Sequence, residues 1–201
     1  MHFSSFALTA LLASTAVASP TWGGEGWKKD WNKKWTDKWN KHDYKNEKVF
    51  SFDKTFVVKA VPKQVIAGQG AAAAPSPGEP GAKGLFKFGI NVADNTICYN
   101  ITLSGVTGEY SSPANTATHI HEAAKGANGP PRLAFPNPVG PDERRVSYGC
   151  LTGPFKTGIV NNGVDTGANF HVKQIVDNPA AFFADTHTAK FTAGAVRGQL
   201  A

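Results

Sequence analysis

The segment that most constrains the fold is LFKFGINVADNTICYNITLSGV, residues 85–106, in which two apolar runs flank a short polar break. The break at residues 93–96 separates runs rich in Ile, Phe and Tyr, which is the pattern of a β-hairpin. In the second run every other residue from Ile97 to Leu103 is apolar, so a strand would bury these side chains on one face. The segment therefore predicts antiparallel strands with one face in a core and the other in solvent.

The polar face of that second run carries Cys98 and Asn100. Asn100 begins the N-glycosylation pattern Asn-Ile-Thr, and an outward direction suits a glycan. Cys150 is the other cysteine of the chain, and a disulfide between the two is favoured in an exported protein over two unrelated buried thiols. Because Cys98 faces outward, we expect the disulfide to tie a surface crossing loop onto this strand, outside the core.

The rest of the chain from residue 49 has the same texture of short apolar runs between Gly, Pro, Asn and Asp. Further strands are expected within VFSFDKTFVVKAV (49–61), ATHIH (117–121), AFFADTHTA (181–189) and AGAVRGQLA (193–201). Such a succession predicts an all-β domain over residues 49–201, an antiparallel Greek-key sandwich or barrel such as an immunoglobulin-like fold.

Two segments of this domain are harder to assign. Residues 122–145 are rich in Gly and Pro and are expected to form one long connection. Residues 170–179, FHVKQIVDNP, fit either a strand or a short helix that ends before Pro179. Both alternatives stay open.

The first nineteen residues, MHFSSFALTALLASTAVAS, have an apolar run followed by small residues, as in a secretory signal peptide. The run is too short to span a bilayer, and no later stretch contains 18 uninterrupted apolar residues. We therefore expect a secreted, extracellular protein without a transmembrane segment. Export also argues against nucleic acid as a partner.

Residues 20–48 form a basic arm that contains every tryptophan of the chain. Trp27, Trp31, Trp35 and Trp39 recur at intervals of four with lysines between them, a spacing that gives one face on a helix and also on a strand. Helical, extended and disordered arms all stay open. Indoles beside lysines suit polysaccharide faces and anionic surfaces, so the arm is expected to attach the protein to a cell wall, an extracellular polymer or a membrane surface. A lid over the domain is the alternative.

The segment ATHIHEAAKGANGPP (117–131), together with FFADTHTAKFTAGAVRGQL (182–200), resembles the chordin-type (CHRD) domain. That domain pairs an H-I-H strand and a G-x-x-G-P loop with a C-terminal H-T…G-x-x-R-G-Q-L signature. Residues 56–65 and 90–106 are similar to its first strand and its central hairpin. The resemblance implies a secreted β-sandwich without an established activity, so the leading hypothesis is a non-enzymatic protein held at a surface by its arm. A ligand-antagonist role, as in chordin, rests on family analogy alone.

A second segment, HIHEAAKGANGPPRLAFPNP (119–138), is similar in layout to the copper-ligand region of copper/zinc superoxide dismutases. On that mapping His119 and His121 match two copper ligands, and Arg197 matches an arginine that guides anions. No histidine stands at residues 133–135, where a metal-bridging ligand is expected, and no His/Asp cluster for zinc follows. The resemblance implies at most a partial site, and it leaves a superoxide-dismutase-like fold open beside the immunoglobulin-like one.

The two histidines of the H-I-H strand stand two residues apart, so both rings leave the same face of a strand. A hydrogen-bonded structural pair is the leading interpretation, with no cofactor. The alternative is a copper-binding redox site, for which His171 or His187 would have to supply a third ligand.

His187 and Arg197 each have a structural interpretation as well. His187 is expected to hydrogen-bond a neighbouring loop carbonyl. Arg197 could bind an anion, but an arginine in a β-sandwich more often stacks and pairs with a carboxylate such as Asp185 or Glu122.

Overall fold

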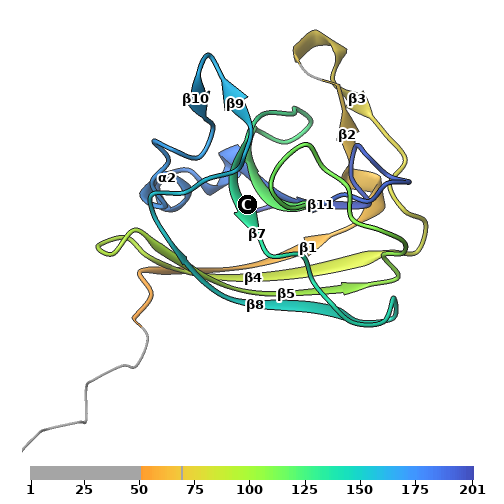
Figure 1. Cartoon of the computed structure of the whole chain (residues 1–201), viewed down its shortest axis with the longest axis horizontal. Coiled ribbons are helices and arrows are strands. Elements are labelled where there is room, and N and C mark those ends of the chain that lie inside the picture. The colour runs from red at the N-terminus through yellow and green to blue at the C-terminus, as the bar shows by residue number, and fades with distance from the viewer. Residues whose placement is uncertain (1–50, 69) are drawn as a thin grey trace, which may run out of the picture. The chain divides into compact units, whose positions relative to one another are not determined.

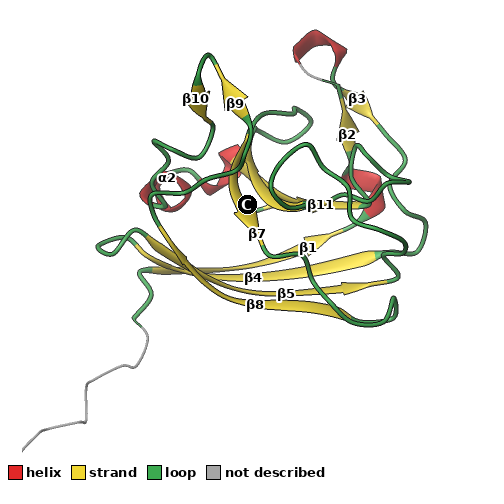
Figure 2. Cartoon of the chain, viewed as in Figure 1, coloured by secondary structure: helices red, strands yellow, loops and turns green. Residues whose placement is uncertain are grey.

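The computed structural model describes residues 51–68 and 70–201; the expected signal peptide and the Trp/Lys arm lie outside the described residues. Two four-stranded antiparallel sheets pack face to face, as Figure 1 and Figure 2 show. Sheet 1 has the order β1 (Lys54–Ala60), β4 (Lys83–Asn91), β5 (Thr96–Ser104) and β8 (Arg145–Thr152). Sheet 2 has the order β12 (Val196–Gln199), β11 (Phe182–Thr186), β6 (Thr118–Glu122) and β7 (Pro131–Phe135). The predicted all-β sandwich is confirmed.

The chain crosses between the sheets three times, from β5 to β6, from β7 to β8 and from β8 to β11. After β6 and β7, which belong to sheet 2, the chain returns to sheet 1, where β8 pairs with β5. This is a Greek-key type of connection. Beyond the end of β1, Val61 exchanges backbone hydrogen bonds with Arg197 of β12, so the two sheets meet at this corner.

Two small hairpins and short helical turns complete the described part. The hairpins are β2 (Ile66–Ala67) with β3 (Ala74–Pro75), and β9 (Val160–Asn161) with β10 (Val164–Asp165). Both rise from the sandwich on the side of sheet 2 in Figure 1. The helices are α2 (Lys173–Asp177) and three 3-10 turns at Pro62–Gln64, Gly70–Ala72 and Pro179–Ala181. None of the helices described is long and apolar enough to cross a membrane.

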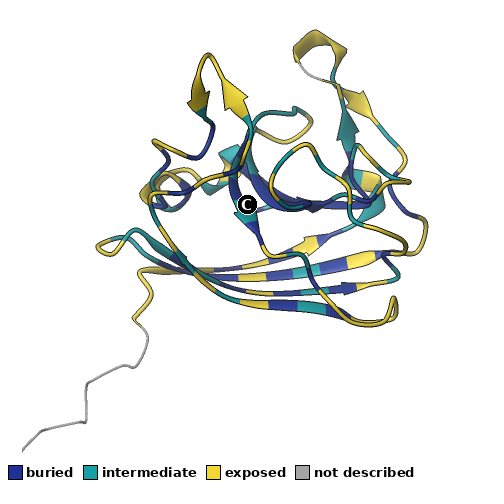
Figure 3. Cartoon of the chain, in the orientation of Figure 1, coloured by how far each residue is buried: buried dark blue, intermediate teal, exposed yellow. Residues whose placement is uncertain are grey.

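Sheet 1 has the alternation that the sequence predicts. Ile97, Ile101 and Leu103 are fully buried, whereas Asn100 is exposed on the opposite face of β5. The buried set meets Phe135 of sheet 2, whose ring lies 4.9 Å from that of Tyr99. Figure 3 shows the same alternation of buried and exposed residues along these strands. Glycosylation of Asn100 stays a prediction.

The predicted disulfide joins Cys98 and Cys150, but the expectation of a crossing loop was wrong. Cys150 lies in β8 directly opposite Cys98 of β5, so the bridge links two neighbouring strands on the outer face of sheet 1. The sequence concealed β8 because its inward positions include Arg145, Ser147 and Gly149, which give no apolar alternation.

The expected long connection at residues 122–145 also contains a strand. β7 begins at Pro131 and lies at the edge of sheet 2, where a proline at the first position of a strand costs no ladder bond. The prolines close to both ends of β7 give the segment the composition of a loop, so its sequence did not indicate a strand. Of the two alternatives for residues 170–179, the short helix is confirmed, because Lys173–Asp177 form α2.

Candidate metal centre

The outer face of sheet 2 carries polar groups that are buried. His119 and His121 lie on β6, and the neighbouring strand β11 places Asp185 opposite His119. His187 follows β11 two residues after Asp185 and so leaves the sheet on the same side. Loops cover this face, and the Asp185 side chain is only 3% exposed. Three imidazoles and a carboxylate are thereby brought together in the interior.

The facing atoms of these four side chains lie close together. His187 Nε2 is 3.0 Å from Asp185 Oδ2, while His121 Nε2 and His119 Nδ1 lie 3.4 and 3.6 Å from Asp185 Oδ1. The same two histidine nitrogens are 3.4 Å apart. All four ligand atoms lie within 4.8 Å of one another, which is the spacing of a metal-ligand set.

In each histidine the other ring nitrogen contacts a backbone carbonyl. These contacts are His119 Nε2 to Thr116 at 2.6 Å, His121 Nδ1 to Gly129 at 2.8 Å and His187 Nδ1 to Thr192 at 2.9 Å. A carbonyl only accepts hydrogen bonds, so in a neutral imidazole the proton sits on the nitrogen that faces the carbonyl. The inward nitrogen then presents a lone pair, as in histidines oriented to bind a metal.

In this arrangement the inward imidazole nitrogens and the Asp185 carboxylate oxygens, all hydrogen-bond acceptors, face one another. Asp185 Oδ1 is buried and accepts no hydrogen bond, and its nearest neighbours are the inward nitrogens of His119 and His121. A buried carboxylate oxygen without a partner is costly. A cation among these atoms would remove the conflict.

Protonation relieves only part of the conflict. Burial alone lowers the pKa of His187, but attraction by Asp185 and hydrogen bonds to Asp185 and the Thr192 carbonyl together raise it above its ordinary value. Burial lowers the pKa of His119. Burial alone raises the pKa of Asp185, yet attraction to positive charge on the neighbouring imidazoles of His121 and His187 holds it well below its usual range. A proton on His187 satisfies Asp185 Oδ2, and Oδ1 gains a partner only when a second proton sits on His121 Nε2, 3.4 Å away.

The spacing is close to that of a ligand set around a small transition-metal ion. Four ligands held about 2.0–2.1 Å from a tetrahedral metal lie about 3.3 Å from one another. The inward nitrogens of His119 and His121 and Asp185 Oδ1 are 3.4–3.6 Å apart, His187 Nε2 lies 3.0 Å from the other carboxylate oxygen, and the whole set lies within 4.8 Å. Three imidazole nitrogens and one carboxylate oxygen form a donor set that suits zinc and copper.

Phe183 on β11 supports the centre from beside it. The His121 ring stacks on Phe183 with 4.8 Å between centroids and 9° between planes. The Arg197 guanidinium lies 3.4 Å from the same ring centroid, and it comes from β12 on the other side of β11. Phe183 is therefore held between the two side chains, and it fixes the plane of one candidate ligand.

Arg197 is 3% exposed, donates a hydrogen bond from Nη2 to the Ala127 carbonyl at 2.7 Å and is not among the described residues that line the pocket. This placement matches the stacked interpretation, and anion binding by Arg197 stays a prediction. Glu122 pairs with Arg132 at 2.7 Å, not with Arg197.

Of the two candidates for a third ligand, the structure brings His187 into the cluster and leaves His171 out. His171 precedes α2, where its Nδ1 accepts a hydrogen bond from the backbone of Lys173. Sequence reasoning treated Asp185 only as a partner for Arg197. The signal it missed is the pair Asp185 and His187, which has the same two-residue spacing as His119 and His121.

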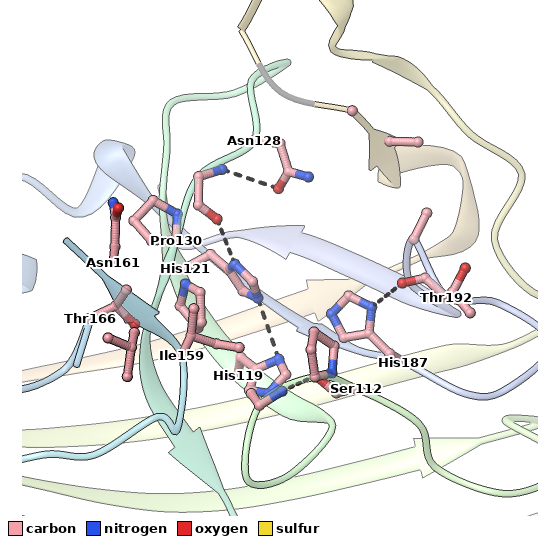
Figure 4. Close-up of a pocket in the computed structure, with 18 residues that line it drawn as sticks. Ser112, His119, His121, Asn128, Pro130, Ile159, Asn161, Thr166, His187 and Thr192 are labelled. Atoms are coloured by element: carbon pink, nitrogen blue, oxygen red, sulfur yellow. Dashed lines mark hydrogen bonds between the residues drawn. The ribbon is translucent and has the colours of Figure 1, made fainter. Parts of the chain in front are cut away.

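A cavity of about 670 Å³ opens onto the cluster. Its lining includes the three clustered histidines, residues 112–114, residues 128–131, residues 159–161 and Thr192. Figure 4 shows the three labelled imidazoles gathered at one part of this lining, with Ile159 and Asn161 across from Thr192. A ligand entering the cavity would meet the histidines, while Asp185 is absent from the lining.

The comparisons with known proteins agree with the resemblance seen in the sequence. The CHRD domain matches residues 65–200, which is more than half of the chain and includes all four residues of the cluster and both cysteines. No curated protein and no solved structure matches the chain. The chain therefore belongs to the CHRD domain family.

Proposed function

We propose that this CHRD domain binds a divalent transition-metal ion through His119, His121, Asp185 and His187. The observation that carries the proposal is the buried, unpartnered Oδ1 of Asp185 beside two inward-facing imidazole nitrogens. A binding site of this kind needs no catalytic group, so the proposed role is binding and not catalysis.

The proposal is preferred over a purely structural set of histidines for a specific reason. Hydrogen bonds to Thr116, Gly129 and Thr192 account for one nitrogen of each ring. The inward nitrogens of His119 and His121 have only a long contact of 3.4 Å with each other, and neither gives Asp185 Oδ1 a hydrogen bond. A metal ion would satisfy these nitrogens and the carboxylate together.

Zinc is the first candidate because a donor set of imidazole nitrogens and a carboxylate oxygen is typical of zinc sites. Copper is the second, because imidazole also suits copper, and a redox role would need copper in the site.

The experiment is metal analysis of protein purified without an affinity tag and reconstituted with Zn²⁺ or Cu²⁺. We expect about one equivalent per chain, strong loss in His121→Ala, and no loss in His171→Ala, because His171 is a histidine outside the cluster. Equal metal content in the two variants, or negligible metal in the unaltered protein, would contradict the proposal.

Export and surface attachment form the second part of the proposed function. The signal-like residues 1–19 and the tryptophan and lysine pattern of residues 20–48 support it, and a disulfide is compatible with an oxidising compartment. We propose that the arm holds the domain on cell-wall polysaccharide or on an anionic surface. Pull-down of residues 20–201 beside residues 49–201, on wall polysaccharide and on anionic vesicles, tests this. Equal binding by both, or binding by neither, would remove the arm from the function.

A further inference from the structure

Two of the four candidate ligands are almost fully buried, and the other two lie nearer the cavity. Asp185 and His119 lie deep against sheet 2, where their side chains are 3% and 1% exposed. His121 and His187 are each 12% exposed, and these two and His119 line the cavity. A metal held by this set would therefore have protein on the side of the sheet and open space on the side of the cavity.

The walls of the cavity supply no further strong ligand. Parts of both small hairpins contribute to it, through Ala67 and Gly68 on one side and Ile159 to Asn161 on the other. Apart from the three histidines, the described lining contains no charged side chain, no Cys and no Met, and its polar side chains are hydroxyls and amides. Such groups can orient a bound molecule by hydrogen bonding, as in small-molecule sites of this size.

Charge decides which molecule would be attracted. Three neutral imidazoles and one carboxylate around a divalent cation leave one net positive charge, and no charged wall offsets it. Arg197 adds a buried positive charge behind the site, close enough to Asp185 to interact with it. A small anion therefore gains the most by binding there, since the field is strong where water is scarce.

We infer that the cavity delivers a small monoanion to the open side of the metal, where it becomes an additional ligand. This inference rests on the proposed metal binding and adds a ligand class to it. Zinc and cobalt in four-coordinate sites can expand to take such a ligand.

The test uses the full chain loaded with Co²⁺, whose visible spectrum reports its coordination, and azide as the anion. We expect a saturable change of the cobalt spectrum on titration with azide. Ala114→Trp places a large side chain in the cavity wall without altering a ligand, and it should weaken azide binding at least about tenfold while cobalt is retained. Val139→Trp, at a position that is 75% exposed and outside the cavity lining, is the matched control and should bind azide like the unaltered protein.

The outcomes separate the two proposals. Retained cobalt with a spectrum that azide does not change would overturn the anion site and leave metal binding intact. Azide binding of equal strength in Ala114→Trp and Val139→Trp would overturn the role of the cavity. Failure to retain cobalt at all would remove the metal centre, and the anion site with it.

Discussion

The outer faces of the two sheets differ in what covers them and in what they carry. On sheet 1 that face is open to solvent, and it holds exposed Asn100, 77% exposed Tyr148 and the disulfide. On sheet 2 the loops cover it, so that His119, Asp185 and Arg197 are buried. Buried polar groups are costly unless something pairs with them. We infer that the outer face of sheet 1 serves the stability of the fold and that the outer face of sheet 2 carries the proposed metal site.

The largest effect is expected on sheet 1. Replacing both cysteines, Cys98→Ser with Cys150→Ser, removes a cross-link between residues 52 apart and should lower the free energy of unfolding by about 4 kcal/mol on the chain-entropy account. Urea denaturation measures it, with Lys87→Ala at an exposed position of the same face as a control that should change stability by less than about 0.5 kcal/mol. Metal content should stay unchanged at a temperature where the variant is folded. Loss of metal from the folded variant would contradict the assignment of stability to sheet 1 and of metal binding to sheet 2.

The next effect belongs to sheet 2. Asp185→Asn keeps the shape of the side chain but removes its charge, and it should weaken Zn²⁺ or Co²⁺ binding by at least about 100-fold, since a charged ligand is lost. Competition with a chelator measures the affinity. Asp177→Asn, in an exposed ion pair with Lys173, should leave it unchanged. Equal affinities in the two variants would show that the carboxylate is no ligand.

A smaller effect is expected where Arg197 supports the centre through Phe183. Arg197→Lys loses the flat guanidinium over the ring and the forked donor, so the free energy of unfolding should fall by roughly 1–2 kcal/mol and metal affinity by about tenfold. Thermal denaturation and chelator competition give the two values. Arg144→Lys, at an exposed position, should change neither value. Metal affinity that is unaffected in Arg197→Lys would confine Arg197 to a packing role.

The smallest effect concerns the loop that carries β9 and β10 beside the cavity. Burial alone raises the pKa of Asp165, but hydrogen bonds from the backbone of Thr157, Gly167 and Gly158 lower it overall. Because the folded pKa lies below the unfolded one, the stability from this carboxylate is present above the unfolded value near pH 4 and is lost as the pH falls through the folded value.

Asp165→Asn should cost roughly 1 kcal/mol at neutral pH, because Asp165 Oδ2 no longer accepts the bond from the Gly158 amide. Amide hydrogen exchange of Thr157, Gly158 and Gly167 measures it. In the unaltered protein the protection should fall below about pH 4, and in the variant it should not show this fall. The same acid-induced fall in both proteins would assign the loop's stability to other groups.

The faces of a strand could be predicted from the sequence only when one of them lies in water. The β4–β5 hairpin and its register were readable because apolar and polar residues alternate when only one face is buried. Strand β11 is buried at every position, so Asp185 stands in a run that shows no alternation. Its role as a candidate ligand was missed for that reason, although β11 itself was expected.

The choice between His171 and His187 was beyond the sequence for a different reason. The two-residue spacing of Asp185 and His187 indicates a shared face, but it does not say which strand lies beside them. The pairing of β6 with β11 decides it, since that register puts Asp185 opposite His119 and brings His187 to the same side.

By itself the sequence determined the all-β class, the hairpin at residues 85–106, the disulfide partners and the shared face of His119 and His121. These features depend on local periodicity and on residue types, which can be read directly from the amino-acid sequence. Only the tertiary structure decided that His187 and Asp185 join that pair, and that Cys150 lies in a strand. Contacts between segments 60 or more residues apart, such as β6 and β11, are set by strand pairing and core packing, which no local pattern encodes.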